Sequence, residues 1–388
     1  MGFDFTSRWD RRLHPAKKWT RYPNDVLPLW VADTDFAVAP VIVKALQERL
    51  AEHPLFGYIA PPKALTEALC QWSRDHYQWQ IEPAWQQWLA GVVPALHVAS
   101  LALTEPGDEL LTVTPIYPPF LEVGKKTGRT MLTVPMLPPS KEIPRWHLDR
   151  DAFENVVTPR TRMLLWCHPH NPTGRVFDRE ELEWLADFVE RHDLLVCSDE
   201  LHCDLIVAPE CRHIPLASIN ARIAHRTITL WAATKTFNIA GLTTACAVIS
   251  DAKLRQRFRD GCEGLMPSHN VLGLIATEAA YREGNAWRIA LLDVLRDNLA
   301  LLGRYVERWS GVICIPPQAT FLAWLDCRHA GLGENPQQVL LDKTRVGLSD
   351  GADFGWPGFV RINLGAPTEV IGEALERMDA LLGPSANR

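Results

Sequence analysis

Long apolar runs are missing from this sequence, and no stretch approaches the roughly 18–20 residues that a membrane-spanning helix needs. The first residues, Met1–Asp10, mix charged and aromatic side chains and contain no apolar segment of the kind that directs secretion. We therefore expect a soluble, cytoplasmic protein.

Excess positive charge is missing as well. The chain carries 40 Lys and Arg against 46 Asp and Glu, a formal net charge of −6, and the two signs are interspersed. Without a basic stripe there is nothing to displace the counterions of a nucleic acid. We expect no nucleic-acid partner and no membrane partner.

The chain also lacks a CxxC pair, although it has nine Cys. An odd number of Cys in a long chain without a secretion signal favours free thiols in a reducing compartment. A zinc site is the alternative, because Cys and His gather at Cys167, His168, His170, Cys197, His202 and Cys203. Their spacing is poor for zinc, since two of these Cys lie inside apolar runs typical of strands. We expect no metal.

What the chain does have is length and a regular alternation of patterns. Its 388 residues exceed the roughly 250–300 at which single hydrophobic cores stop growing, so two domains are expected. Short β-rich apolar runs alternate with amphipathic helical runs, which predicts an α/β fold with a mostly parallel sheet covered on both faces. The predicted strands are Glu109–Val113, Met163–Cys167, Leu194–Ser198, Thr227–Trp231 and Thr244–Ile249.

The pattern changes after about residue 281. Before it, Asp178 and Glu181 form a capping box that predicts a helix between the second and third strands. After it, the sequence predicts a long helix through Trp309, strands at 312–315, 321–325 and 359–364, and helices after Pro336 and from Thr368. We expect a large domain at 38–280 and a small α+β domain formed by 1–37 with 281–388.

Polar residues cluster where the predicted strands end. Ligands of open α/β sheets bind outside the carboxyl ends of the strands, so these clusters are candidates for a site. They are Ile116–Phe120, Asn171–Gly174, Ser198–His202 and Thr234–Asn238.

Each cluster alone has an ordinary structural explanation. Asn-Pro-Thr-Gly is a good turn, Asp-Glu after a strand is often a helix cap, and one Lys in a loop is usually a solvated charge. Together they place an acid, an amide, an aromatic face and an amine at one sheet edge. Pyridoxal 5′-phosphate (PLP) requires this set: an amine for a Schiff base, a carboxylate to keep the pyridine nitrogen protonated, and donors for the ring hydroxyl.

The phosphate of this cofactor also needs a helix N-terminus or a similar set of donors. A helix is expected at Ala95–Leu103 with Pro94 at its first position, which leaves the preceding amides of Val92 and Val93 free for an anion. An ordinary turn at Gly91 explains that glycine equally well.

The run Ala233–Leu242 resembles the PLP-lysine segment of fold type I aminotransferases, specifically the bacterial cystathionine β-lyase group that includes MalY and PatB. The similarity extends over nearly the whole chain and implies an aspartate aminotransferase-like fold. The other segments that carry it are Trp30–Phe36, Phe56–Tyr58, Gly91–Ala95, the Tyr117 loop, Asn171–Gly174, Ser198–His202 and Phe359–Leu364.

The resemblance implies a role for each matching residue around the cofactor. Lys235 would be the Schiff-base lysine and proton shuttle, and Asp199 the partner of the pyridinium nitrogen. Asn171 would contact the ring hydroxyl with His202 close by, and Tyr117 would stack on the ring.

The resemblance implies further contacts to the substrate and to a second subunit. Arg361 would hold the α-carboxylate of the substrate, for which a planar guanidinium is better suited than Lys. Ala32 would also line the substrate site, and Thr234 would contact the phosphate. Tyr58 would reach the phosphate or substrate of the neighbouring subunit, which implies a homodimer with sites at its interface.

Three positions depart from the pattern of this group. Thr34 stands where Met is frequent, which we interpret as a packing change. Ala232 stands where Ser commonly donates to the phosphate, so Thr234 and backbone amides would carry more of that contact. Thr243 stands where many transaminases have Lys or Arg on the phosphate, and its presence favours the lyase branch.

The resemblance therefore implies a PLP-dependent carbon–sulfur β-lyase, also termed a cysteine-S-conjugate β-lyase. Its substrate would be L-cystathionine or a related S-substituted L-cysteine, and its products a thiol, pyruvate and ammonia. An aminotransferase, which forms the same Cα carbanion, is one alternative. A MalY-like protein that also binds a transcriptional regulator is the other, although no residue identifies such a surface.

Overall fold

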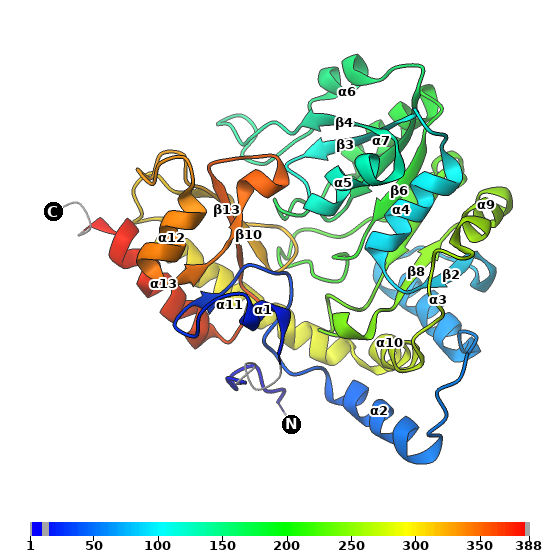
Figure 1. Ribbon diagram of the computed structural model, residues 1–388, viewed down its shortest axis with the longest axis horizontal. Coiled ribbons are helices and arrows are strands. Elements are labelled where there is room, and N and C mark those ends of the chain that lie inside the picture. Colours follow the sequence, from blue (N-terminus) through cyan, green and yellow to red (C-terminus); the bar gives the residue numbers. More distant parts are fainter. Residues whose placement is uncertain (1, 10–14, 385–388) are drawn as a thin grey trace.

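The computed structural model describes residues 2–9 and 15–384. Two sheets dominate these residues: a seven-stranded sheet, and a four-stranded antiparallel sheet beside it (Figure 1). No helix in the described ranges combines the length and apolar character that crossing a membrane demands.

The seven-stranded sheet has the order β2-β8-β7-β6-β5-β3-β4, and only β8 runs against the others. β3 and β7 are buried along their whole length, which is typical of a sheet covered on both faces. This confirms the predicted mostly parallel α/β sheet. The strands are β2 (Gln86–Leu89), β3 (Glu109–Thr114), β4 (Thr130–Pro135), β5 (Thr161–Cys167), β6 (Leu195–Asp199), β7 (Thr227–Trp231) and β8 (Ala245–Val248).

The five strands predicted in this part of the chain all form, within two residues at each end. The sequence did not reveal β2 and β4. β2 begins with two Gln, which are poor strand signals, and β4 is an edge strand whose side chains are mostly exposed or half-buried.

Helices cover both faces of the large sheet. Alternate side chains of each strand join different clusters: Leu165 packs with α4, α5 and α9, whereas Leu164 and Trp166 pack with α6 and α7. The capping box of α7 is present, because Asp178 accepts from the Glu181 amide and Glu181 accepts from the Asp178 amide. These helices are α4 (Val92–Leu103), α5 (Pro118–Thr127), α6 (Arg150–Val156), α7 (Arg179–Arg191), α8 (Ala221–Ala224) and α9 (Ala252–Cys262).

The four-stranded sheet has the order β12-β13-β10-β9 and packs against helices α11, α12 and α13 through an apolar cluster (Figure 1). The predicted helix through Trp309 forms but is wrong at both ends. It begins at Asn285, after a break at Gly284 where a Cβ would lie 2.5 Å from the Phe237 ring, and it ends at Val306. The elements are β9 (Ile313–Cys314), β10 (Leu322–Asp326), β12 (Ser349–Asp350), β13 (Phe359–Asn363), α10 (Val271–Glu283), α11 (Asn285–Val306), α12 (Pro336–Thr344) and α13 (Thr368–Leu382).

The N-terminal stretch contributes β1, which pairs in parallel with β11 to form a separate two-stranded sheet. The domain bounds 1–37, 38–280 and 281–388 stay a prediction, and Met1, residues 10–14 and residues 385–388 lie outside the described residues. The remaining elements are β1 (Leu27–Pro28), β11 (Val346–Gly347), α1 (Lys17–Thr20), α2 (Pro40–Glu52) and α3 (Lys63–Tyr77).

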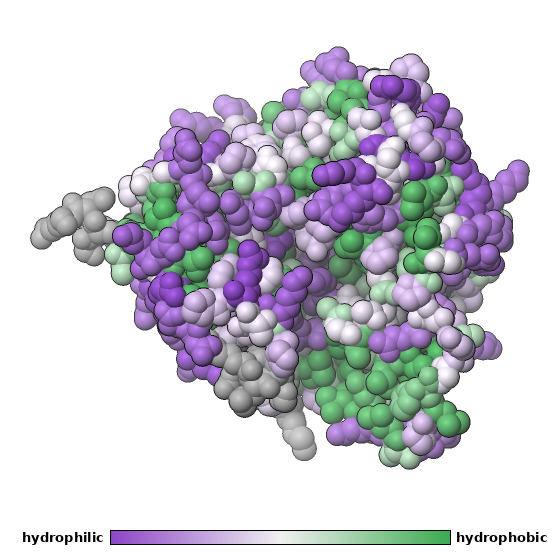
Figure 2. Space-filling view, viewed as in Figure 1, coloured by the Kyte–Doolittle hydropathy of each residue, from purple (hydrophilic) through white to green (hydrophobic). Residues whose placement is uncertain are grey.

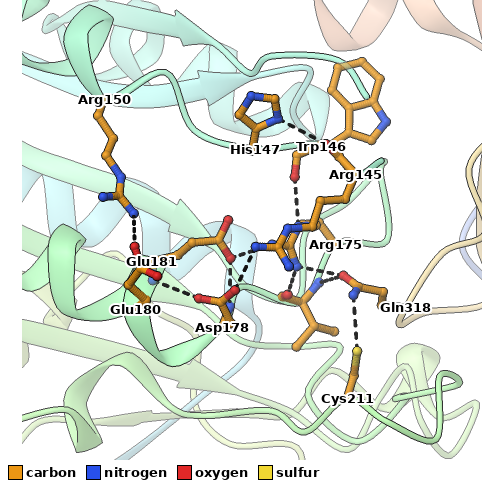
Figure 3. Close-up of polar contacts among 11 residues, drawn as sticks. Arg145, Trp146, His147, Arg150, Arg175, Asp178, Glu180, Glu181, Cys211 and Gln318 are labelled. Carbon is orange, nitrogen blue, oxygen red and sulfur yellow. Dashed lines mark hydrogen bonds and ion pairs between the residues drawn. The ribbon is translucent and has the colours of Figure 1, made fainter. Parts of the chain in front are cut away.

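A buried polar joint connects the two sheets (Figure 3). Arg175 donates to the Gln318 side chain at 2.8 Å and to Glu181 at 2.5 Å, which links the segment before β10 to the start of α7. Gly174 accepts hydrogen bonds from the amides of Gln318 and Ala319, both at 2.9 Å. Its φ of +67° and its close approach to the neighbouring segment require glycine. The joint therefore fixes where residues of the second sheet meet the large sheet.

Candidate active site

A cavity of about 440 Å³ lies beside the carboxyl ends of β5, β6 and β7, where β13 and the segment 30–32 face them. Its volume is in the range of small-molecule sites. Every residue predicted for the site lines it except Tyr58. The predicted residues along its wall are Ala32, Val92, Val93, Tyr117, Asn171, Asp199, His202, Thr234, Lys235 and Arg361.

Asp199 ends β6 and is buried. Its Oδ1 accepts a hydrogen bond from the Leu201 amide at 3.1 Å, and no other described residue donates to the carboxylate. Burial raises its pKa to about 7. The residues after it form turns rather than a helix, so the carboxylate is not a helix cap. A buried, sparsely bonded carboxylate of this kind attracts a cationic or N–H-bearing group.

Lys235 enters the same cavity from the segment after β7. Its Nζ donates to the Ala32 carbonyl at 2.6 Å. Burial lowers its pKa, and the Asp33 charge opposes this effect. A buried amine with a lowered pKa is more readily available as the neutral nucleophile.

Ala32 is held in place because the carbonyls of its segment are bonded one after another. Asn363 donates to the carbonyls of Val31 and Asp33 at 2.6 and 2.8 Å. Asn238 donates to the carbonyls of Thr34 and Phe36 at 3.1 and 2.7 Å. This strap, residues 30–36, thereby fixes the acceptor that faces the Lys235 amine.

A buried ion pair supports the strap from behind. Lys18 Nζ lies 2.8 Å from Asp35 Oδ2 and 3.1 Å from the Asp33 carbonyl, and Lys18 is fully buried. A buried charge persists only when it is paired and hydrogen-bonded, so this lysine serves the packing of the strap.

Arg361 reaches the cavity from β13 of the second sheet. It donates to Asn171 Oδ1 and to the Trp30 carbonyl, both at 2.9 Å, and to Ser349 Oγ at 3.3 Å. No carboxylate of the described residues lies within 4.0 Å of it, which disfavours the alternative of a structural ion pair. Burial lowers its pKa to about 10. The arrangement leaves a buried guanidinium without a counter-charge beside the cavity.

Two rings complete the inner wall. His202 is buried, and burial, followed by the charges of Lys235 and Arg361, lowers its pKa to about 3, so its imidazole is neutral. Tyr117 is the N-cap of α5, and burial raises the pKa of its phenol. The Nδ1 atom of His202 and the Nε atom of Arg361 are buried without a partner among the described residues. Such atoms cost free energy unless a ligand or a rearrangement satisfies them.

The N-terminus of α4 faces the cavity, although the predicted helix start was wrong. The helix begins at Val92, so Pro94 occupies its third position instead of its first. Proline is tolerated there because no amide of the first turn bonds within the helix, and the sequence does not distinguish these positions. The amides of Val92 and Val93 remain without an intrahelical acceptor, as an anion site requires. The backbone of Gly91 is extended at φ 168°, which does not demand glycine.

Sequence reasoning missed Glu200, which lies next to Asp199 behind the cavity wall. Its carboxylate accepts from Ser198 Oγ at 2.9 Å, from the Leu216 amide at 3.1 Å, and faces His213 Nε2 at 2.8 Å. The Asp-Glu pair is visible in the sequence, but two of the partners of Glu200, Leu216 and His213, come from a later segment of the chain. The Cys and His considered for zinc do not assemble, since no group of three potential ligands occurs in the described ranges.

Comparison with known proteins places the chain among characterised sequences and structures. The profile of "Aminotransferase class I and II" matches residues 24–378. "Cystathionine beta-lyase PatB" of Bacillus subtilis is 34% identical over 98% of this chain and 100% of the relative. "Protein MalY" of Escherichia coli is 32% identical over 94% of this chain and 95% of the relative.

Solved structures agree with this placement. A structure titled "Crystal Structure of OvoB" has a TM-score of 0.93 and 43% identity, covering 98% of this chain and 99% of the other. Cystalysin from Treponema denticola, whose title states that it contains PLP, has a TM-score of 0.92 and 32% identity, covering 98% of both chains.

Proposed function

The chain belongs to the aminotransferase class I and II family, and from its site we propose that it is a PLP-dependent carbon–sulfur β-lyase. The observation that carries the proposal is the convergence of Asp199, Lys235 and Arg361 on one cavity from three separate segments. Relatives named cystathionine β-lyase, at 32–34% identity over nearly the whole chain, support the lyase over the aminotransferase. The substrate is an S-substituted L-cysteine such as L-cystathionine.

The residues present fit PLP. Asp199 offers a carboxylate to the ring nitrogen, Asn171 an amide to the ring hydroxyl, and Tyr117 an aromatic face to the ring. His202 stands beside them as a neutral imidazole. The first amides of α4 and the Thr234 hydroxyl would hold the phosphate, because Ala232 offers no hydroxyl and Thr243 no positive charge at the cavity wall.

Proton transfer is the task of Lys235. Arg361 binds the α-carboxylate and thereby holds Cα within reach of Lys235 Nζ, which removes the Cα proton. When bound, PLP supplies the electron sink that makes this proton acidic. The Cβ–S bond then breaks, sulfur leaves with the bonding electrons and takes a proton, and water converts the remaining aminoacrylate to pyruvate and ammonia.

A second subunit completes the proposal. Tyr58 is 95% exposed, and with Leu55 and Phe56 it follows α2 in a loop that leaves apolar surface uncovered. Figure 2 shows apolar residues gathered over the α2 end of the molecule. Large exposed apolar patches mark interaction surfaces. We propose a homodimer in which Tyr58 reaches the neighbouring cavity. The additional regulator-binding role stays a prediction.

The test is a product assay. Purified protein loaded with PLP is incubated with L-cystathionine in the absence of any keto acid, and pyruvate and free thiol are measured. Equal amounts of both are expected. Pyruvate formation that requires an added keto acid, with amino transfer to it, would replace the lyase by the aminotransferase.

Two variants accompany the assay. Lys235→Ala should abolish turnover and the visible absorbance of bound PLP while the protein stays folded, because the substitution removes the amine that serves as base. Lys253→Ala removes an exposed lysine of α9 and should change neither. Near-normal turnover by Lys235→Ala would reject the site.

A further inference from the structure

Glu200 follows Asp199 at the end of β6 and is not among the residues that line the cavity. The main chain of this pair is fixed on both sides. The His168 amide donates to the Asp199 carbonyl at 2.9 Å, and the Glu200 amide donates to the Leu230 carbonyl at 3.0 Å. Successive side chains of an extended chain point in opposite directions. The Glu200 carboxylate therefore lies behind Asp199, on the side away from a ligand.

The Glu200 carboxylate is surrounded by four hydrogen-bonding groups, two at each oxygen. Oε1 accepts from Ser198 Oγ at 2.9 Å and from the Leu216 amide at 3.1 Å. Oε2 accepts from Trp231 Nε1 at 3.3 Å and faces His213 Nε2 at 2.8 Å. A backbone amide and an indole N–H can only donate, and one of them points at each oxygen. An ionised carboxylate accepts at both oxygens, so the geometry favours the ionised form.

No cation offsets this charge. Burial lowers the pKa of His213 to about 3, so its ring is neutral and donates through Nε2. His168, whose ring centre lies 4.6 Å from that of His213, is neutral as well, because burial lowers its pKa well below the usual range. Among the described residues, no Lys or Arg nitrogen lies within 4.0 Å of the Glu200 carboxylate. Burial raises the pKa of Glu200 to about 7, and above that pH the structure holds a buried negative charge behind Asp199.

This charge acts on Asp199. Burial is the main cause of the raised pKa of Asp199, and the Glu200 charge raises it further. A like charge behind an acid strengthens the hold of that acid on a proton. A proton shared between Asp199 and the ring nitrogen of PLP is therefore held more firmly while Glu200 is ionised.

We propose that Glu200 is a positioning residue for the cofactor that acts through Asp199: its buried negative charge helps to keep the ring nitrogen protonated. The inference rests on the cofactor of the proposed function and not on its substrate. A purely structural Glu200 would tie the ends of β6 and β7 to the segment 213–216 and would have no effect on the ring nitrogen.

The experiment measures how tightly the PLP-free protein binds PLP and 1-deaza-PLP, in which a C–H group replaces the ring nitrogen, by equilibrium dialysis at pH 8.5. Both compounds carry the same aldehyde and phosphate. Glu200→Gln keeps the shape and removes the charge. It should weaken PLP binding about 5- to 20-fold and 1-deaza-PLP binding less than about twofold, since a neighbouring charge shifts an ionisation by about one unit or more. In the Asp199→Asn background, Glu200→Gln should change neither affinity, because no acid is left to hold the ring proton.

Three further variants separate charge from structure. Ser198→Ala removes one donor but keeps the Glu200 charge, and Glu183→Gln removes an exposed charge of α7, so both should leave the two affinities unchanged. Glu200→Asp keeps the charge on a shorter side chain and should retain the preference for PLP over 1-deaza-PLP even if the melting temperature falls. If Glu200→Gln does not fold, this variant decides, and loss of the preference in Glu200→Asp would overturn the inference.

Two other results would also overturn it. One is that Glu200→Gln weakens both compounds equally or neither. The other is that Glu200→Gln weakens PLP binding equally in the Asp199→Asn background. Both would leave Glu200 a structural residue while the cofactor stands. Failure of the unaltered protein to bind PLP would instead reject the proposed function together with this inference.

Discussion

Replacing Arg361 by Lys separates a substrate-binding role from a structural one. In the structure the guanidinium donates to Asn171, to the Trp30 carbonyl and to Ser349, and no carboxylate of the described residues neutralises it. A substrate carboxylate would be its missing counter-charge. Lysine keeps the charge but offers a point donor in place of the planar pair of N–H groups.

The expected magnitude follows from the lost bond. A hydrogen bond to a charged group contributes about 1.5–3 kcal/mol, and about 1.4 kcal/mol corresponds to a factor of ten. Arg361→Lys should therefore raise KM roughly 10- to 150-fold for every L-amino acid substrate. Affinity for PLP should barely change, because the groups assigned to the cofactor remain.

The assay measures KM, PLP affinity and the melting temperature together. Arg175→Lys is the matched control, since Arg175 is equally buried but belongs to the joint between the sheets and pairs with Glu181. Both variants should melt at lower temperature, and only Arg361→Lys should raise KM. A lowered melting temperature with KM unchanged in Arg361→Lys would refute the carboxylate role.

Three further predictions concern Asp199 and Gly174. Asp199→Asn should still bind PLP but lose most of its turnover, because an amide does not hold the ring nitrogen protonated; activity within a few-fold of the unaltered enzyme would contradict this. In the PLP-free protein, the pKa of Asp199 is raised to about 7, so its contribution to stability is present below pH 4 and is lost as pH rises towards 7. The fall in melting temperature over that range should be smaller in PLP-free Asp199→Asn, and identical slopes would count against the raised pKa. Gly174→Ala should cost about 2–4 kcal/mol, because its φ is +67° and the new Cβ would lie 2.2 Å from Pro317 Cβ. Gly303→Ala, with nothing within 4 Å of the added Cβ, should be neutral or slightly stabilising in urea unfolding.

The sequence was sufficient to locate the strand ends of the large sheet and the residues that follow them. Apolar runs fixed β3 and β5–β8 to within two residues, and in an open α/β sheet the position of a strand end dictates where ligand-binding side chains emerge. Asn171, Asp199 and Lys235 were predicted to share a cavity for this reason, and they do. The resemblance added Arg361, which no local pattern marks as a neighbour of these three.

The sequence did not determine at which residue α4 begins, because proline is equally compatible with several positions of the first helical turn.

Only the tertiary structure decided the contacts that close the site. Arg361 and Asn171 meet across 190 residues, Lys235 and Ala32 across 203, and Arg361 and Trp30 across 331. Local propensity and periodicity report on neighbours within a few turns or one strand, so they carry no information on such distances. These contacts arise because the joint at Gly174 and the strap at residues 30–36 bring the second sheet against the ends of the first, and that docking is a property of the packed molecule.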